Sequence, residues 1–178
     1  LGFRVHVFAP PEADNVAFAA AHRAFEAPYA DTAAMAEFAA TVDVVTFEFE
    51  NVPVAALDGI KTPIHPNPSA LAAAQDRLGE KAFLAGCGLT VAPHIAVDDA
   101  ASLERARQDI PDGSLKSRRL GYDGKGQVRI TDAVSSGDAM DALGGVPSIL
   151  EALIPFEAET SVVLARGADG AWAAYDSA

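Results

Sequence analysis

The sequence is short of the residues on which several common kinds of site depend. It contains 1 cysteine among 178 residues, so no disulfide can form within the chain and a reducing, cytoplasmic setting is expected. No apolar run is long enough to cross a bilayer. No histidine lies at metal-ligand spacing from another histidine, a cysteine or an acid, and no serine lies in a nucleophile elbow. These absences disfavour disulfide-rich, membrane-spanning, zinc-binding and serine-hydrolase proteins.

Positive charge is also scarce. The chain has 13 lysines and arginines against 25 aspartates and glutamates, a net charge of -12. Such a chain is disfavoured as a general nucleic-acid binder or as a partner of an anionic membrane. The exception is a local basic island made of Lys116, Arg118, Arg119 and Lys125. An island of this size fits a small anionic ligand better than a polymer.

A glycine-rich segment lies within this island. Gly121, Gly124 and Gly126 follow one another closely in the run from Leu115 to Gln127. A glycine-rich turn lets backbone N–H groups converge on an anion, and the nearby cations supply charge for phosphate oxygens. The order G-x-x-G-x-G matches neither the dinucleotide fingerprint nor the Walker pattern, and Asp-Gly is common in ordinary hairpins. The segment is therefore either a loop that closes over phosphates or a hairpin turn.

The first seventy residues alternate strand-like and helix-like patterns, which predicts a parallel sheet with covered faces. We expect a strand at Arg4–Phe8 and a buried strand at Val42–Phe47. Helices are expected at Thr32–Ala40, with Thr32 as the N-cap, and at Pro53–Ile60.

The pattern changes near residues 73–76, where we expect a domain boundary. Helices are predicted at Asn67–Ala74 and Arg77–Ala85, and Cys87 is expected to be buried in helical structure. The second half is predicted to be an α+β unit with antiparallel strands. Its expected strands are His94–Val97, Ser114–Arg118, Gln127–Ile130, Ser148–Glu151, Glu159–Ala165 and Ala171–Tyr175, and its helices Ser102–Gln108 and Ala133–Leu143.

Four charged residues could serve a ligand. Glu48 and Glu50 alternate with aromatic residues at the carboxyl end of a predicted parallel strand, where ligands bind in open α/β sheets. Lys116 could reach a phosphate if its strand faces a cleft. Glu151 ends a strand just before Pro155, and the extended backbone after it could read an adenine edge. In each case an ordinary solvated strand residue is the alternative.

Four segments, taken together, resemble the N5-carboxyaminoimidazole ribonucleotide synthetase family of the ATP-grasp superfamily. They are Thr46–Pro53 (TFEFENVP), Gln75–Phe83 (QDRLGEKAF), Leu115–Gln127 (LKSRRLGYDGKGQ) and Leu150–Ser161 (LEALIPFEAETS). The resemblance implies an α/β N-terminal domain with an incomplete parallel sheet at 1–74. It further implies an α+β ATP-grasp lid domain at 75–154 and the beginning of the ATP-grasp C-terminal domain at 155–178. The family's opening G-x-G-Q-L-G turn, its magnesium ligands and its bicarbonate-binding cluster do not occur in these residues. The chain thus resembles a fragment, and we expect no turnover from it alone.

The resemblance implies an ATP-dependent carbon-nitrogen ligase of purine biosynthesis. ATP and bicarbonate would form carboxyphosphate, which carboxylates the 5-amino group of 5-aminoimidazole ribonucleotide. The implied cofactors are ATP and Mg²⁺, the metal being held by residues outside this chain. Small molecules are the expected partners, without nucleic acid or membrane, and a homodimer is possible. The alternatives are another ATP-grasp ligase, of the glycinamide ribonucleotide transformylase or biotin carboxylase type, and a non-catalytic nucleotide-binding module.

The same resemblance implies which residues bind the ligands. The nucleotide-binding positions are Arg77, Lys116, Gly121, Tyr122, Asp123, Gly124, Lys125, Gly126, Gln127, Glu151, Ala152, Leu153, Ile154 and Glu159. Tyr122, Asp123 and Lys125 would also close over the ribonucleotide, which Glu48 or Glu50 would meet. No catalytic residue and no metal ligand is assigned within the chain.

Overall fold

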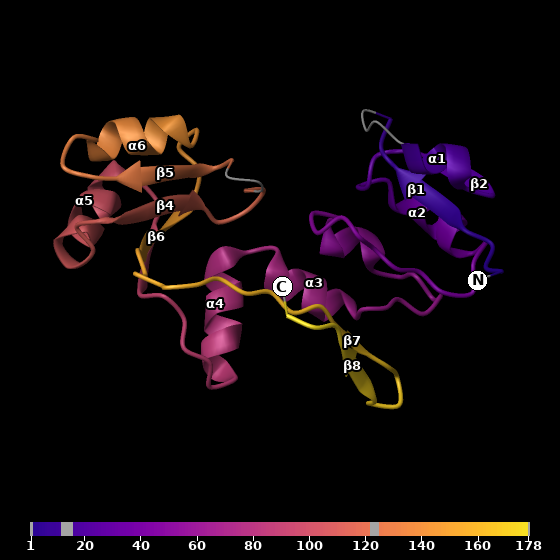
Figure 1. Ribbon diagram of the computed structural model, residues 1–178. Helices are drawn as coiled ribbons and strands as arrows, with labels where there is room; N and C mark the ends of the chain where they lie inside the picture. The colour runs from indigo at the N-terminus through magenta and orange to yellow at the C-terminus, as the bar shows by residue number, and fades with distance from the viewer. Residues whose placement is uncertain (1, 12–15, 122–124, 178) are drawn as a thin grey trace.

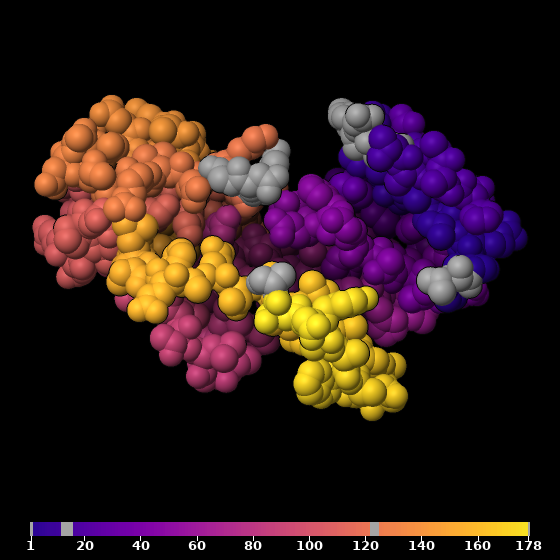
Figure 2. All heavy atoms as spheres, viewed as in Figure 1, coloured from indigo at the N-terminus to yellow at the C-terminus, as the bar shows by residue number. Residues whose placement is uncertain are grey.

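The computed structural model describes residues 2–11, 16–121 and 125–177, which form two lobes and an arm (Figure 1). The N-terminal lobe comprises residues 2–66, the sheet lobe residues 93–152, and the C-terminal arm residues 153–177. Helices α3 (Pro68–Ala74) and α4 (Arg77–Gly86) lie between the two lobes. Figure 2 shows a notch between the lobes, with the arm projecting from the opposite side of the molecule.

The N-terminal lobe is built on a parallel strand pair, as the alternation of elements predicts. Strand β1 (His6–Ala9) runs parallel to β2 (Arg23–Glu26), and the short helix α1 (Val16–Ala20) lies between them in the chain. Helix α2 (Thr32–Ala39) buries its apolar side against this pair. Helix α1 and strand β2 were not predicted, because each is short and mostly exposed and so lacks a clear hydrophobic period.

Three local predictions in this lobe are wrong. The N-cap of α2 is Asp31, whose carboxylate accepts hydrogen bonds from two N–H groups of the first turn, while Thr32 is already helical. The predicted strand Val42–Phe47 is reduced to one parallel bridge between Val45 and Ile64. The segment that carries Ile64 is flanked by prolines, which have no backbone N–H to donate. The pairing with the segment around Val45 therefore cannot extend beyond this single bridge. The predicted helix Pro53–Ile60 is only a 3₁₀ turn, η1 (Val54–Leu57).

The sheet lobe confirms the predicted antiparallel α+β unit. Its four strands lie in the order β3-β6-β4-β5, and every neighbouring pair is antiparallel. The strands are β3 (His94–Val97), β4 (Gly113–Ser117), β5 (Gln127–Ile130) and β6 (Ser148–Ala152), and the helices are α5 (Ala100–Asp109) and α6 (Ser136–Ala142). Helix α6 begins three residues later than predicted, because the Ser135 side chain caps it.

The two faces of this sheet differ in chemistry. Leu115 on β4 lies opposite Leu150 on β6, and both are fully buried against α5 and α6. Because successive side chains of a strand point to opposite faces, Lys116 and Glu151 lie on the other face of the sheet. That charged face is the one turned away from α5 and α6, and it carries part of the candidate site.

The arm ends in a small hairpin of β7 (Leu164–Arg166) and β8 (Trp172–Ala174), both exposed. The predicted strand Glu159–Ala165 is wrong for its first five residues, which lie outside any strand. Cys87 was expected to be buried, but it follows α4 as the C-cap and is exposed, because α4 itself buries none of its residues. Within the described ranges, no helix has the length and apolar character needed to cross a membrane.

Candidate functional site

Three consecutive residues, Gln75, Asp76 and Arg77, connect the two lobes. We call them the junction. The Gln75 side-chain amide donates hydrogen bonds to the backbone carbonyls of Glu50, at 2.9 Å, and of Val52 in the N-terminal lobe. Two residues later, the Arg77 backbone N–H donates to the Arg118 carbonyl of the sheet lobe at 3.0 Å. The junction therefore fixes the segment that carries Glu50 relative to the strand that leads into the glycine-rich segment.

Arg77 also holds the stem of the glycine-rich segment. Its Nε donates to the Ser117 carbonyl at 3.2 Å, and its Nη2 donates to the Gly121 carbonyl at 2.9 Å. The far side of the stem closes on the same serine, whose N–H donates to the Gly126 carbonyl at 2.8 Å. A Cβ on Gly126 would lie 2.6 Å from Ser117 Oγ, and the residue has φ +70°. The stem therefore requires glycine at position 126 for both space and conformation.

Asp76 joins the beginning of α4 to the end of β4. One carboxylate oxygen accepts from the N–H groups of Leu78 and Gly79, which caps the helix. The Arg118 guanidinium donates to both oxygens, at 2.9 and 2.6 Å. The hydrogen bond from Arg118 is the largest cause that lowers the pKa of Asp76; burial opposes it and the two N–H groups support it. Asp76 is 8% exposed, so its carboxylate is buried, whereas the Arg118 side chain is half-buried.

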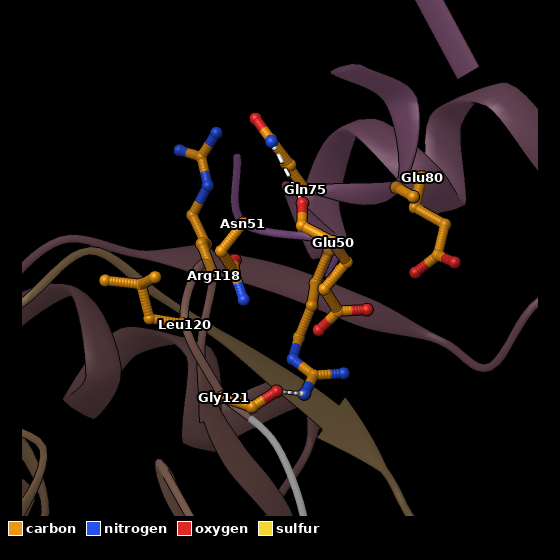
Figure 3. Close-up of a pocket in the computed structure, with 9 residues that line it drawn as sticks. Glu50, Asn51, Gln75, Glu80, Arg118, Leu120 and Gly121 are labelled. Atoms are coloured by element: carbon orange, nitrogen blue, oxygen red, sulfur yellow. Dashed lines mark hydrogen bonds between the residues drawn. The ribbon is translucent and has the colours of Figure 1, made fainter. Parts of the chain in front are cut away.

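The junction lines a polar cavity of about 240 Å³ between the lobes (Figure 3). Its walls come from three parts of the chain that are far apart in sequence. The lining residues are Glu50, Asn51, Ala74, Gln75, Arg77, Glu80, Arg118, Leu120 and Gly121. In Figure 3 the Glu50 carboxylate points toward the side of the cavity where Gly121 lies. The cavity thus offers carboxylate acceptors and guanidinium donors beside the stem of the glycine-rich segment.

The structure separates the two candidate acids of the N-terminal lobe. Glu50 lines the junction cavity, whereas Glu48 lines a different hollow together with Tyr29 and Phe49. Burial, and then the charge of Glu48, raises the pKa of Tyr29. Of these two acids, Glu50 is therefore the one that lies in the same cavity as the glycine-rich stem.

Lys116 and Glu151 form a charged cluster with a third residue, Lys81 of α4. Lys116 Nζ lies 2.8 Å from Glu151 Oε2, and Lys81 Nζ lies 3.3 Å from Glu151 Oε1. Glu151 is 8% exposed, so it is not the solvated strand end of the alternative interpretation. Burial acts to raise the pKa of Glu151, but the hydrogen bonds and charges of Lys116, and then of Lys81, outweigh it and the pKa is lowered. The carboxylate is therefore held in its ionised form.

The remaining predicted positions are distributed differently. Lys125, Gly126 and Gln127 form the returning limb of the glycine-rich segment, and Gln127 pairs with Lys116 in the sheet. Ala152 follows Glu151 and donates to the Pro93 carbonyl, while Leu153 and Ile154 begin the exposed arm. Glu159 lies exposed in the arm, outside any helix or strand. Tyr122, Asp123 and Gly124 lie outside the described residues.

Sequence reasoning missed Gln75, Asp76 and Lys81 as functional candidates. All three belong to the QDRLGEKAF segment, from which only Arg77 was selected. A signal was available, because Asp76 stands at the N-cap position and Lys81 follows Arg77 by one helical turn. What the sequence did not indicate is the identity of their partners, which lie about forty residues or more away: Arg118 for Asp76 and Glu151 for Lys81.

The described residues do not provide a metal centre. Outside the gaps at 12–15 and 122–124 and the two terminal residues, no group of three or more His, Cys, Asp or Glu side chains could hold a metal ion. The two buried acids of the site, Asp76 and Glu151, are each paired with cations. The described residues therefore do not fit a magnesium site.

Acid is expected to destabilise the protein through Asp76 and Glu151. Their folded-state pKa values are lowered, so ionisation favours the folded state above their ordinary unfolded pKa values, which are about 4. This stabilisation of the folded state is lost as the pH falls through the lowered pKa values of the two carboxyl groups in the folded protein. The free energy of unfolding, measured by urea denaturation from pH 7 to pH 3, should fall below about pH 4.5. The Asp76→Asn/Glu151→Gln double variant should show a shallower fall, and an equally steep one would contradict this origin.

Comparison with protein families agrees with this geometry. Residues 82–178, more than half of the chain, match the ATP-grasp domain. This chain belongs to the ATP-grasp family. Residues 1–75 match the ribonucleotide synthetase preATP-grasp domain. The two matches meet around the junction, so this ATP-grasp protein has the preATP-grasp unit on one side of it and the ATP-grasp unit on the other.

The ATP-grasp chain has relatives named N5-carboxyaminoimidazole ribonucleotide synthase. The one from Brucella melitensis is 44% identical over 173 residues, which cover 94% of this chain and 48% of that protein. The one from Pseudomonas aeruginosa is 38% identical over 147 residues, covering 81% of this chain and 41% of that protein. The chain therefore spans about half the length of the curated relatives it matches.

Solved structures of the same kind share the fold. The N5-carboxyaminoimidazole synthetase from Staphylococcus aureus complexed with ADP matches with a TM-score of 0.91 and 28% identity, over 99% of this chain and 48% of that one. The carboxyaminoimidazole ribonucleotide synthase from Aspergillus clavatus complexed with ATP matches with a TM-score of 0.87 and 26% identity, over 97% and 46%. The overall fold of this chain is thus the fold of the matching part of these two synthetases.

Proposed function

We propose that the complete protein containing this chain carboxylates the 5-amino group of 5-aminoimidazole ribonucleotide, using ATP and bicarbonate. The observation that carries the proposal is the junction cavity, which brings Glu50 and the stem of the glycine-rich segment together. The relatives at 44% and 38% identity bear the name of this activity. In this function the preATP-grasp unit supplies the acceptor site and the ATP-grasp unit supplies the nucleotide site.

The nucleotide is proposed to bind along the charged face of the sheet. Lys116 would donate to phosphate oxygens, the backbone from Glu151 to Ile154 would meet the adenine edge, and Glu159 would reach the ribose. The glycine-rich segment, from Gly121 to Gln127, would fold over the phosphates and exclude water from carboxyphosphate. Support comes from the ADP and ATP complexes of the matching Staphylococcus and Aspergillus enzymes.

The acceptor is proposed to bind in the junction cavity. Glu50 would accept hydrogen bonds from an amine or hydroxyl of the ribonucleotide, and Tyr122, Asp123 and Lys125 would close over it. Arg77 would act mainly by holding the stem, because its guanidinium donates to the Ser117 and Gly121 carbonyls. A carboxylate in a partly enclosed cavity discriminates strongly between ligands with and without a matching donor.

The wider assignments are proposals of the same kind. We propose domain boundaries at residues 74/75 and 154/155, which the family matches at 1–75 and 82–178 support near the first boundary. A cytoplasmic, homodimeric enzyme that uses magnesium with its ATP is proposed on the family resemblance alone.

The experiment is ADP release by the product of the complete reading frame, with magnesium and bicarbonate, with and without aminoimidazole ribonucleotide. We expect release to depend on the ribonucleotide. In the Glu50→Gln variant the KM for the ribonucleotide should rise about tenfold, because a donor group of the ribonucleotide loses its charged acceptor. The Glu48→Gln variant is the matched control and should stay within about twofold of the parent protein, since Glu48 lies in another hollow.

Two results would contradict the proposal. ADP release that ignores the ribonucleotide but responds to another acceptor would keep the ATP-grasp assignment and discard the substrate. Equal effects of the Glu48 and Glu50 substitutions would remove the acceptor from the junction cavity.

A further inference from the structure

Lys81 is the inner lysine of the charged cluster that it forms with Lys116 and Glu151. It is not among the ligand-binding residues that the family resemblance implies. Its side chain is 15% exposed, against 25% for Lys116. In the described part of the chain, Glu151 is the only carboxylate within 4 Å of either lysine. Two ammonium groups thus share one carboxylate, and the cluster carries one positive charge more than its own pairing needs.

The second ammonium group affects whether Lys116 can leave Glu151 to bind a phosphate. A lysine that turns toward a ligand leaves its carboxylate, and a buried carboxylate without a partner is costly. Here each lysine contacts a different oxygen of Glu151: Lys116 contacts Oε2 and Lys81 contacts Oε1. One contact can therefore be released while the other remains.

The positions of the two lysines indicate which of them is released. Lys116 is the more exposed, and it precedes Ser117, the residue on which the glycine-rich stem closes. Lys81 lies on α4, the helix that begins with Arg77 and is attached to the stem through it. The outer lysine is thus the one with access to a ligand on this face, and the inner one is held on α4.

We propose that Lys81 is a positioning residue of the nucleotide site, which keeps Glu151 paired when Lys116 turns to the nucleotide phosphates. The proposal rests on the proposed function, because that function assigns the phosphates to Lys116. Lys81 does not touch the nucleotide in this scheme; it acts through Glu151. The consequence is specific to phosphorylated ligands, because only they draw Lys116 away from the carboxylate.

The test is calorimetric binding of ADP and adenosine to the product of the complete reading frame. In Lys81→Met, ADP should bind about tenfold more weakly, because engaging the phosphates now leaves Glu151 unpaired. Adenosine should bind within about twofold of the parent protein, because its binding leaves the Lys116–Glu151 pair intact. Lys81→Arg should restore most of the ADP affinity, because it restores the cation. A loss of general packing would instead weaken both ligands equally, and that result would overturn the proposal.

A double-mutant cycle separates action through Glu151 from direct contact with phosphate. In a Glu151→Gln background the carboxylate charge is gone, so adding Lys81→Met should change ADP affinity by less than about twofold. The same tenfold loss in both backgrounds would mean that Lys81 binds the phosphate itself, which overturns the positioning role. If the parent protein binds adenosine and ADP but Lys81→Met matches it, the inference fails and the proposed function stands. If the parent protein binds neither, both fail.

Discussion

Replacing Asp76 by alanine is expected to lower the free energy of unfolding by about 2 to 3 kcal/mol, because it removes a buried helix cap and leaves the half-buried Arg118 guanidinium without its carboxylate partner. The carboxylate is engaged on both sides, by two N–H groups of α4 and by Arg118 of the sheet lobe. Its loss therefore weakens the start of α4 and its attachment to β4 together. Urea denaturation followed by far-ultraviolet circular dichroism measures the change.

Two further variants make this result diagnostic. Asp76→Asn keeps an oxygen that can cap the helix but loses the charge, so its loss of stability should fall between those of the parent protein and the alanine variant. Asp112→Ala removes the carboxylate of an exposed pair, with Arg129, and should cost less than about 1 kcal/mol. Equal losses of unfolding free energy in Asp76→Ala and Asp112→Ala would show that the Asp76–Arg118 pair contributes no more to stability than an exposed ion pair.

Replacing Lys116 by methionine is expected to reduce kcat/KM for ATP about a hundredfold, because a charge-assisted hydrogen bond to phosphate is lost inside the site. The fold should survive this change. Glu151 keeps Lys81 as a partner, and methionine retains the apolar stem of the lysine. Steady-state ADP release by the product of the complete reading frame measures the effect.

The matched control is Lys61→Met, the same exchange at an exposed lysine of the N-terminal lobe. It should leave kcat/KM within about twofold of the parent protein. An undiminished rate in Lys116→Met would remove Lys116 from the nucleotide site. It would also leave the Lys81 proposal without its premise.

Local patterns were enough to predict the sheet lobe. The strand expected at Ser114–Arg118 is confirmed by β4 (Gly113–Ser117), whose apolar face, with Leu115, and charged face, with Lys116, appear in the structure. The N-terminal lobe was predicted less well for a reason that is not local. Val45 has the composition of a strand residue, but its ladder is limited by prolines in a partner segment almost twenty residues away.

The candidate site shows the same limit. The sequence directed attention to Lys116, Glu151 and the glycine-rich segment, because each carries a recognisable chemical pattern. Residue patterns alone could not predict that Glu50 and Gly121 line one cavity, since their meeting depends on how the two lobes pack; only the family resemblance implied that one of the two acids and the glycine-rich segment meet the same ligand. Nor could those patterns predict that Lys81 shares a carboxylate with Lys116, because α4 and β4 come together only in the tertiary structure.

The junction has no spacer. Gln75 is the C-cap of α3 and Asp76 is the N-cap of α4, so one helix ends where the next begins. On either side of that single peptide bond, Gln75 contacts one lobe and Asp76 and Arg77 contact the other. A flexible linker would let the lobes diffuse independently, whereas here the two helices between the lobes meet at a single peptide bond that is hydrogen-bonded to both lobes. We therefore expect any opening of the two lobes to be a rotation about this joint, which would change the distance between Glu50 in one lobe and the Gly121 stem in the other.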